Sequence, residues 1–138
     1  MMNNKTLLEN IPFGVILHNS DGLIIDANKL VEKILKISLN EIIGKKWSNL
    51  SFKVVNKEGV ECIIEEAIVK DVLTSGRDVK DQVVSIVHPS NRNVIWINIT
   101  ILFKPAEVGS KSEQNQALMY ISDVTDIVKT NVAIENTV

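Results

Sequence analysis

The sequence predicts an α+β fold in which two groups of β-strands flank a helical middle segment. Apolar and polar residues alternate near the N-terminus and again over residues 81–124, as expected of strands with one buried face. Between these groups, residues 27–43 and 60–74 place apolar side chains at the three- and four-residue spacing of amphipathic helices. The expected order of elements is therefore β-β-α-α-α-β-β-β.

The composition is that of one globular domain and excludes several classes of protein. Of the 138 residues, 45% are hydrophobic and 23% are charged, which is ordinary for a soluble domain. The net charge of -2 provides no basic surface for nucleic acid. No apolar run approaches the roughly 18–20 residues of a membrane span, and the single cysteine, Cys62, excludes an internal disulfide. We expect a cytoplasmic domain that binds no nucleic acid and makes no direct membrane contact.

The N-terminal part is expected to contain a short helix followed by a hairpin. Residues 1–11 include the stretch NNKTLLEN, which has the pattern of an amphipathic lead-in helix capped by an asparagine. Residues 13–19 alternate as a strand, Ser20–Gly22 has the composition of a turn, and residues 23–28 form the return strand.

The helical middle is expected to contain three helices. From Ala27, apolar positions fall on one side of a helix and lysines face water. The S-x-x-E pattern of Ser38–Glu41 is a capping box that starts a second short helix, which ends at a glycine. Residues 51–59 are expected to be a loop, and a third helix runs from about Val60 to Thr74, with Gly76 as its stop.

The C-terminal half is expected to form three strands, over residues 81–88, 94–102 and 117–124. The middle strand reads VIWINITIL, with isoleucine at every second position. Because successive side chains of a strand point to opposite faces, these isoleucines share one face, and Trp96, Asn98 and Thr100 lie on the other. The isoleucine face is expected to be buried.

This order of elements resembles the PAS domain family over nearly the whole chain. The segments that carry the resemblance are GVILHNSDGLIIDAN, the helix pair ending in EIIGKKW, and the closing DVTD. The last is similar to the D-x-T-[DE] signature at which PAS domains continue into a signalling helix. The resemblance implies a five-stranded antiparallel sheet with helices packed on one face. It also implies a lead-in helix over residues 1–11, a PAS domain over 12–125, and the start of a C-terminal signalling helix or linker over 126–138.

The inner face of such a sheet would be almost entirely aliphatic here. Two interpretations stay open: the face closes on itself as a dry core, or it encloses an apolar ligand such as a fatty acid. The side chains assigned to this candidate pocket are Val83, Ser85, Val87, Ile95, Ile97, Ile99, Ile101, Ala117, Met119 and Ile121.

The residues disfavour both flavin and haem. Flavin-binding members of the family carry a reactive cysteine just after the glycine that ends the second helix, and Trp47 stands at that position. Those members also hold the flavin edge with amide side chains, where this sequence has Val87, Ile97 and Ile121; polar groups buried against aliphatic side chains would stay unpaired. Haem-binding members use a histidine on the long helix, and residues 60–74 contain none. We expect no cofactor, with an apolar small molecule as the alternative.

The outer face of the sheet is too apolar to stand exposed to water. In the family this face commonly packs against the lead-in helix or against a second copy of the domain, so the resemblance implies a homodimer. Trp96 and Tyr120 are the expected anchors, since aromatic side chains with a polar atom suit contact surfaces. The residues assigned to this face are Trp96, Asn98, Leu102, Leu118 and Tyr120.

The end of the last strand is the expected point of signal transfer. Asp123 is expected to hydrogen-bond nearby backbone, and Thr125 to cap the helix that leaves the domain. A change in packing at the sheet would then alter how this corner holds the exit helix, and pass to an output domain of the same polypeptide beyond residue 138.

The sequence contains no recognisable catalytic or metal-binding constellation. Cys62 lies next to apolar Ile63 and Ile64, without a neighbouring histidine or lysine to activate its thiol. The favoured function is a non-catalytic PAS sensory or dimerisation module, with a histidine kinase as the first candidate for the parent protein. The alternatives are a regulatory domain of a transcription factor or cyclic-dinucleotide enzyme, and a free-standing protein that binds an apolar small molecule.

Overall fold

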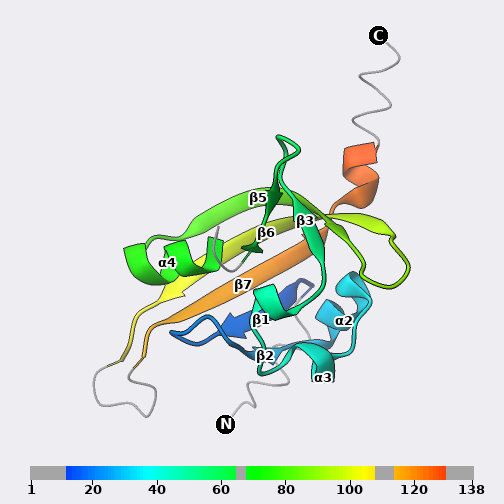
Figure 1. Cartoon of the computed structure of the whole chain (residues 1–138). Helices are drawn as coiled ribbons and strands as arrows, with labels where there is room; N and C mark the ends of the chain where they lie inside the picture. Colours follow the sequence, from blue (N-terminus) through cyan, green and yellow to red (C-terminus); the bar gives the residue numbers. More distant parts are fainter. Residues whose placement is uncertain (1–11, 65–67, 108–113, 130–138) are drawn as a thin grey trace.

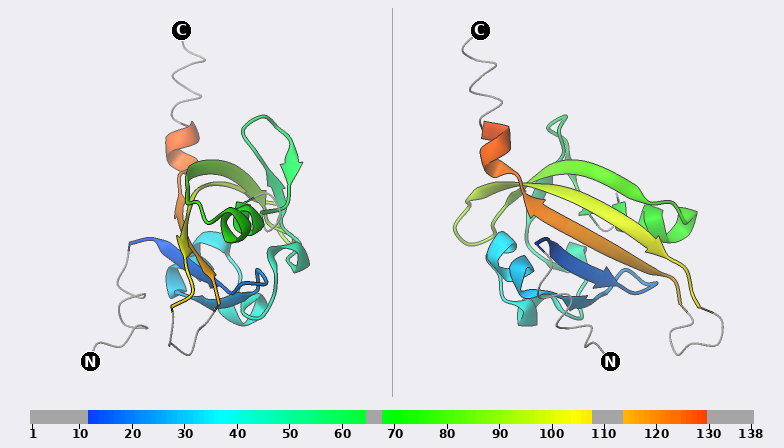
Figure 2. Two further views of the ribbon diagram at one scale, coloured as in Figure 1. Left: turned by 90° about the vertical axis from the view of Figure 1, so that its left-hand side faces the viewer. Right: turned by 180° about the vertical axis from the view of Figure 1, so that it is seen from behind.

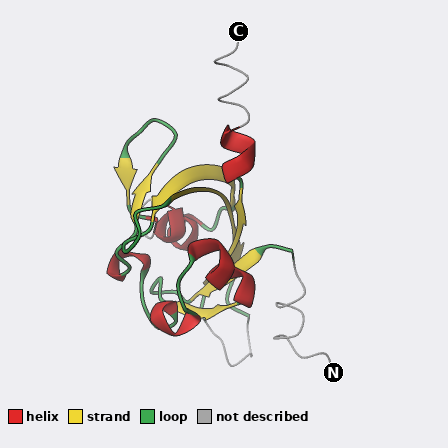
Figure 3. Ribbon diagram, turned by 90° about the vertical axis from the view of Figure 1, so that its right-hand side faces the viewer, coloured by secondary structure: helices red, strands yellow, loops and turns green. Residues whose placement is uncertain are grey.

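A curved antiparallel sheet and a set of helices form the two layers of the molecule (Figure 1). The computed structural model describes residues 12–64, 68–107 and 114–129, so the lead-in helix expected for residues 1–11 lies outside the described residues. The sheet has the strand order β2-β1-β7-β6-β5-β3-β4, and helices α2, α3 and α4 lie on its concave side (Figure 3). The expected α+β class is confirmed, with seven strands in place of the expected five.

The expected N-terminal hairpin is formed by β1 (Gly14–His18) and β2 (Ile24–Ala27). Its turn is organised by Asn19, whose Oδ1 accepts hydrogen bonds from the backbone N–H groups of Asp21 and Leu23 at 2.9 and 3.0 Å. On its other edge β1 pairs with β7, which brings the two ends of the domain together within the sheet.

Two short helices follow the hairpin as predicted, α2 (Lys29–Leu35) and α3 (Leu39–Ile42). Lys36 ends α2 in the left-handed conformation, with φ of 57°. Ser38 caps α3, but its hydroxyl accepts from the N–H of Asn40 instead of the residue further along that a capping box would use. The buried side chains of α2 are Val31, Ile34 and Leu35.

The middle of the chain contains a hairpin that the sequence pattern does not reveal. β3 (Lys53–Val55) and β4 (Glu61–Cys62) pair with each other, and β3 also pairs with β5. Asn56 closes the turn by accepting two backbone N–H groups through its Oδ1. The loop expected over residues 51–59 and the helix expected to begin at Val60 are therefore wrong. Strands of two and three residues are too short to show alternation, and pairing with β5 decides their conformation.

The C-terminal part of the expected third helix is present as α4. α4 covers Lys70–Ser75 and ends, as predicted, at Gly76, which has φ of 70°. Val72 is its fully buried residue, and α4 contacts β6 and β7 across the interior.

The three strands predicted for the C-terminal half form the centre of the sheet. They are β5 (Val79–Val87), β6 (Val94–Lys104) and β7 (Gln116–Asp123). The register of β5 against β6 shifts between Val79 and Gln82, where Asp81 adopts a positive φ of 55°.

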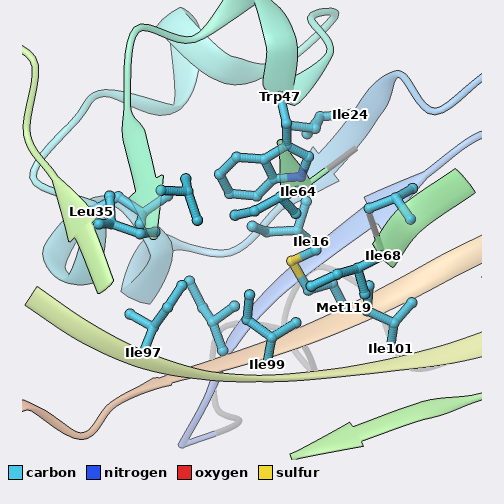
Figure 4. Close-up of a cluster of buried hydrophobic side chains, with 14 of the residues drawn as sticks. Ile16, Ile24, Leu35, Trp47, Ile64, Ile68, Ile97, Ile99, Ile101 and Met119 are labelled. Carbon is cyan, nitrogen blue, oxygen red and sulfur yellow. The ribbon is translucent and has the colours of Figure 1, made fainter. Parts of the chain in front are cut away.

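The hydrophobic core lies between the sheet and the helices. Trp47, from the short 3-10 helix η1 (Trp47–Asn49), and Ile64 face Ile99 and Met119 across this space (Figure 4). Gly14 on β1 leaves room for side chains of both layers, because a Cβ at this position would lie 2.7 Å from Cγ1 of Ile121 on the neighbouring β7 and 3.2 Å from Cδ1 of Ile34 on α2.

Candidate functional site

The central part of the inner face of β6 and β7 is fully buried. An exposed fraction of 0% is shared by the predicted inner residues Ile97, Ile99, Ile101, Ala117, Met119 and Ile121. Ile95 is partly buried and packs against the same core. These side chains belong to one buried hydrophobic cluster together with residues of the helical layer.

The inward residues of β5 differ from the prediction. Val87 pairs with Val94 and Ser85 with Trp96, so the even-numbered residues of β5 face the isoleucine side of β6. Val84 and Ile86 are accordingly buried in the core.

The assignment of Val83, Ser85 and Val87 to the inner wall is therefore wrong. A shift of one residue in register exchanges the two faces of a strand, and the turn over residues 88–93 sets that register. The apolar character of both faces of β5 conceals the difference in the sequence.

A hydrogen-bonded pair of side chains lies inside the domain. Trp47 Nε1 donates to His18 Nε2 at 2.9 Å, and His18 Nδ1 lies 3.1 Å from the carbonyl oxygen of Ala117. Since an indole N–H can only donate, Nε2 must be the acceptor and Nδ1 must carry the proton that Ala117 accepts. His18 is 0% exposed and Trp47 is 4% exposed. The tryptophan at the position of the flavin sensors' cysteine thus fills the interior and ties the helical layer to β1.

Asn28 is a second buried polar side chain whose role the sequence analysis did not identify. Its Oδ1 accepts the N–H of Val15 at 3.0 Å, and its Nδ2 donates to the carbonyl oxygen of Phe13 at 2.9 Å. The side chain therefore continues the pairing of β1 beyond the end of β2. An asparagine just before a helix usually indicates an N-cap, which is why the sequence pattern conceals this function.

The outer face combines apolar and polar side chains that are only partly buried. The predicted residues Trp96, Asn98, Leu102, Leu118 and Tyr120 all have intermediate burial. The outer face points toward the reader in the right view of Figure 2, where β7 and β6 run across the front. Register pairs on this face are Asn98 with Ser122 and Leu102 with Leu118.

A hollow of about 380 Å³ lies on this outer face. Leu102, Tyr120 and Phe13 supply apolar surface to it, and the rings of Phe13 and Tyr120 meet edge to face with centroids 6.4 Å apart. Asp81 and Asn98 supply polar groups. A smaller hollow of about 100 Å³ lies near Trp47, between η1 and β4.

The corner after β7 ties two strands to the exit helix. Thr125 Oγ1 accepts the N–H of Trp96 at 2.9 Å and donates to Asp123 Oδ1, and the N–H of Val124 donates to the carbonyl oxygen of Trp96 at 2.8 Å. Asp123 Oδ1 also accepts the N–H of Thr125 at 2.9 Å, so its expected bond to nearby backbone is confirmed. The expected capping role of Thr125 is wrong, because its hydroxyl bonds to β6. Residues 125–129 are helical, as predicted for the start of the exit helix.

Cys62, the candidate nucleophile of the sequence, lies in an environment that does not activate its thiol. Burial, and next the charge of Glu61, raise the pKa of Cys62, which disfavours the thiolate that a nucleophile requires. Across the described ranges, His, Cys, Asp and Glu side chains form no group able to hold a metal ion. In the same part of the chain, no helix combines the length and apolarity needed to cross a lipid bilayer.

Comparisons with known proteins identify the family. The family model described as the PAS fold matches residues 3–100, and the chain therefore belongs to the PAS family. No curated protein matches the sequence.

Solved PAS domains share the fold at low sequence identity. The PAS domain of nitrogen regulation protein NR(II) from Vibrio parahaemolyticus has a TM-score of 0.63 and 16% identity, over 89% of this chain and 99% of that one. A PAS domain from Colwellia psychrerythraea gives 0.62 and 18%, over 89% and 95%. The Vibrio cholerae VqmA dimer, described as a LuxR-type receptor, gives 0.66 and 12%, over 92% and 53%.

Proposed function

We propose that this chain is the sensory and dimerisation module of a signal-transduction protein, and that its Asp123–Thr125 corner passes packing changes to an output domain. PAS domains are generally sensory, non-catalytic modules, and this chain belongs to that family. A histidine kinase is our first candidate for the parent, because similar solved domains include a PAS domain from a two-component sensor histidine kinase. A transcription-factor parent stays the alternative, in line with the similarity to VqmA.

The observation that supports this proposal most is the pair of hydrogen bonds that the Thr125 hydroxyl makes with two different strands. Its single hydroxyl accepts from β6 and donates to Asp123 at the end of β7, just where the exit helix begins. A change in the spacing of β6 and β7 must therefore strain or break one of these bonds. The exit helix starts at this junction, so its orientation depends on both strands (Figure 2).

Self-association through the outer face is the second part of the proposal. The support is that two aromatic side chains, Trp96 and Tyr120, are only partly buried and lie on the face of the sheet away from the helices. The solved VqmA structure, which has a similar fold, is a dimer. An apolar small-molecule carrier is less favoured, because the inner side chains that would line its cavity are 0% exposed.

Replacement of Thr125 by valine tests the signalling corner. We expect Thr125→Val to leave Trp96 N–H without its acceptor and to increase amide hydrogen exchange at Val128, whose N–H bonds to Val124. Loss of the sheet's global stability should be small, about 1–2 kcal/mol. Heteronuclear NMR of the 138-residue chain measures both effects.

The matched control is Thr74→Val. The Thr74 hydroxyl bonds only to carbonyl groups of its own helix, at Lys70 and Asp71. This variant should leave exchange at Val128 unchanged. If Thr125→Val also leaves the exit helix unchanged, the corner does not hold it and the proposed route of transmission is incorrect.

A further inference from the structure

The outer hollow has an apolar end and a polar end. Phe13, Leu102 and Tyr120 form the apolar part, in which the two rings are nearly perpendicular at 80°. The volume of about 380 Å³ falls in the range of small-molecule sites in proteins. A ligand with a short hydrocarbon or aromatic stem would therefore find both space and apolar surface here.

Asp81 is held in position at the polar end by the irregularity in β5. It adopts φ of 55°, a conformation that few residues other than glycine, asparagine and aspartate tolerate. Its backbone N–H donates to Thr100 Oγ1 at 3.2 Å, and its Oδ1 accepts from Asn98 Nδ2 at 3.0 Å. The carboxylate is thus anchored on the face of β6 while remaining exposed.

Asn98 leaves a hydrogen-bond acceptor unused beside this carboxylate. In the described part of the chain, Asn98 Oδ1 is a buried atom that accepts no hydrogen bond. Exchanging the amide nitrogen and oxygen by a 180° rotation would not relieve the unpaired acceptor, because it would place the Asn98 oxygen against the Asp81 carboxylate, where two acceptors repel each other. A buried acceptor without a donor is unfavourable, and Asn98 keeps this arrangement because its Nδ2 holds the Asp81 carboxylate.

The lining of the hollow has the chemistry of a receptor for a cation. Among the described residues that line it, Asp81 supplies a carboxylate and Asn98 an amide, and none is a lysine or an arginine. Anions would be repelled by Asp81, and neutral apolar molecules would leave the acceptors unpaired. A protonated amine supplies both a positive charge and N–H donors, and aromatic rings attract such groups.

We propose that this hollow binds a small organic cation, an ammonium or guanidinium group on an apolar stem. The charged group pairs with the exposed carboxylate of Asp81, which Asn98 Nδ2 holds in place, and the stem packs against Phe13, Leu102 and Tyr120. Binding requires no covalent chemistry, and because Asn98, Leu102 and Tyr120 also belong to the face proposed for self-association, the ligand competes with the dimer for this surface.

The position of the hollow gives the site a regulatory consequence. Ser122 belongs to its lining, is the register partner of Asn98, and immediately precedes Asp123. A cation that draws on Asn98 would therefore act on β6 and β7 next to the corner that holds the exit helix. This regulatory step rests on the proposed function, whereas the binding itself does not.

Titration with matched small molecules tests the site. The probes are phenethylamine, its neutral analogue 2-phenylethanol and the anion 3-phenylpropionate, added to the ¹⁵N-labelled 138-residue chain. We expect phenethylamine alone to bind saturably, with amide shifts centred on Asn98, Tyr120 and Ser122. Equal binding of all three probes, shifts centred on Ile97 and Ile99 inside the domain, or no saturation in the millimolar range would overturn the proposal.

Asp81→Asn is the decisive variant, because asparagine tolerates the same positive φ and keeps an acceptor for Asn98 while removing the charge. We expect about tenfold weaker binding of phenethylamine, the effect of losing one charge-assisted hydrogen bond. Asp71→Asn is the control: Asp71 is exposed on α4 and does not line the hollow, so affinity should not change. Unchanged affinity in Asp81→Asn would exclude the site.

This titration is independent of the test of the signalling corner. Absence of binding leaves the role of Thr125 intact, since exchange at Val128 is measured without a ligand. Conversely, an exit helix that is insensitive to Thr125→Val leaves the cation site intact and removes only its regulatory consequence.

Discussion

The inner and outer faces of the central strands β5, β6 and β7 differ in how completely their side chains are buried and hydrogen-bonded. On the inner face, Ile97 and Met119 are 0% exposed and make contacts that only apolar atoms can supply. On the outer face, Trp96 and Tyr120 are partly exposed, and Asn98 keeps an unused acceptor. The inner face therefore determines stability, and the outer face is free to determine contacts with other molecules.

The irregular segment of β5 explains part of this difference. Regular pairing on both sides would satisfy the strand completely, but the register shift before Gln82 places Asp81 beside the outer hollow. Such irregularities reorient side chains at functional sites in many sheets. A comparison of substitutions on the two faces tests the division of roles.

The largest effect is expected from Ile97→Asn on the inner face. The change removes a fully buried aliphatic side chain and buries an amide without partners, at a cost of about 3–5 kcal/mol. Urea denaturation measures the free energy of unfolding. The neighbouring outer substitution Asn98→Ile is the control and should cost far less. Similar losses for both would contradict the distinction between the faces.

An intermediate effect is expected from Trp47→Phe. The phenylalanine ring fills most of the space but cannot donate to His18 Nε2, so the free energy of unfolding should fall by about 1–3 kcal/mol. Trp96→Phe makes the same chemical change on the outer face and should alter stability by less than about 0.5 kcal/mol. Thermal and urea denaturation of both variants give the comparison, and equal losses would mean that the interior hydrogen bond contributes nothing.

Of the three substitutions Ile97→Asn, Trp47→Phe and Trp96→Ala, the last is expected to reduce stability least and to change association most. Removal of a partly exposed ring should weaken self-association more than folding. Sedimentation velocity at matched concentrations measures the monomer and dimer populations. Ile25→Ala, at an exposed position on β2, is the control and should leave them unchanged. Identical populations for wild type and Trp96→Ala would remove the outer face from the dimer proposal.

Local patterns in the sequence were sufficient for five of the seven strands, β1, β2, β5, β6 and β7, and for most turns. The alternation in VIWINITIL predicted the buried isoleucines correctly, and glycine chemistry predicted the end of α4 at Gly76. Both depend on neighbouring residues alone: strand periodicity follows from backbone geometry, and a left-handed helix end follows from the missing side chain.

Tertiary structure decided the features that need partners distant in the sequence. Val84 rather than Val83 faces the core because β5 aligns with β6 in one register, and both residues are valines. Two hydrogen bonds, from Trp47 Nε1 to His18 Nε2 and from the N–H of Trp96 to Thr125 Oγ1, each join residues 29 positions apart. The sequence by itself determined which residues can be buried and where the chain can turn, because these are properties of single residues and their neighbours. Only the folded chain decided which polar groups meet, because a hydrogen bond requires atoms within about 3 Å and at a suitable angle.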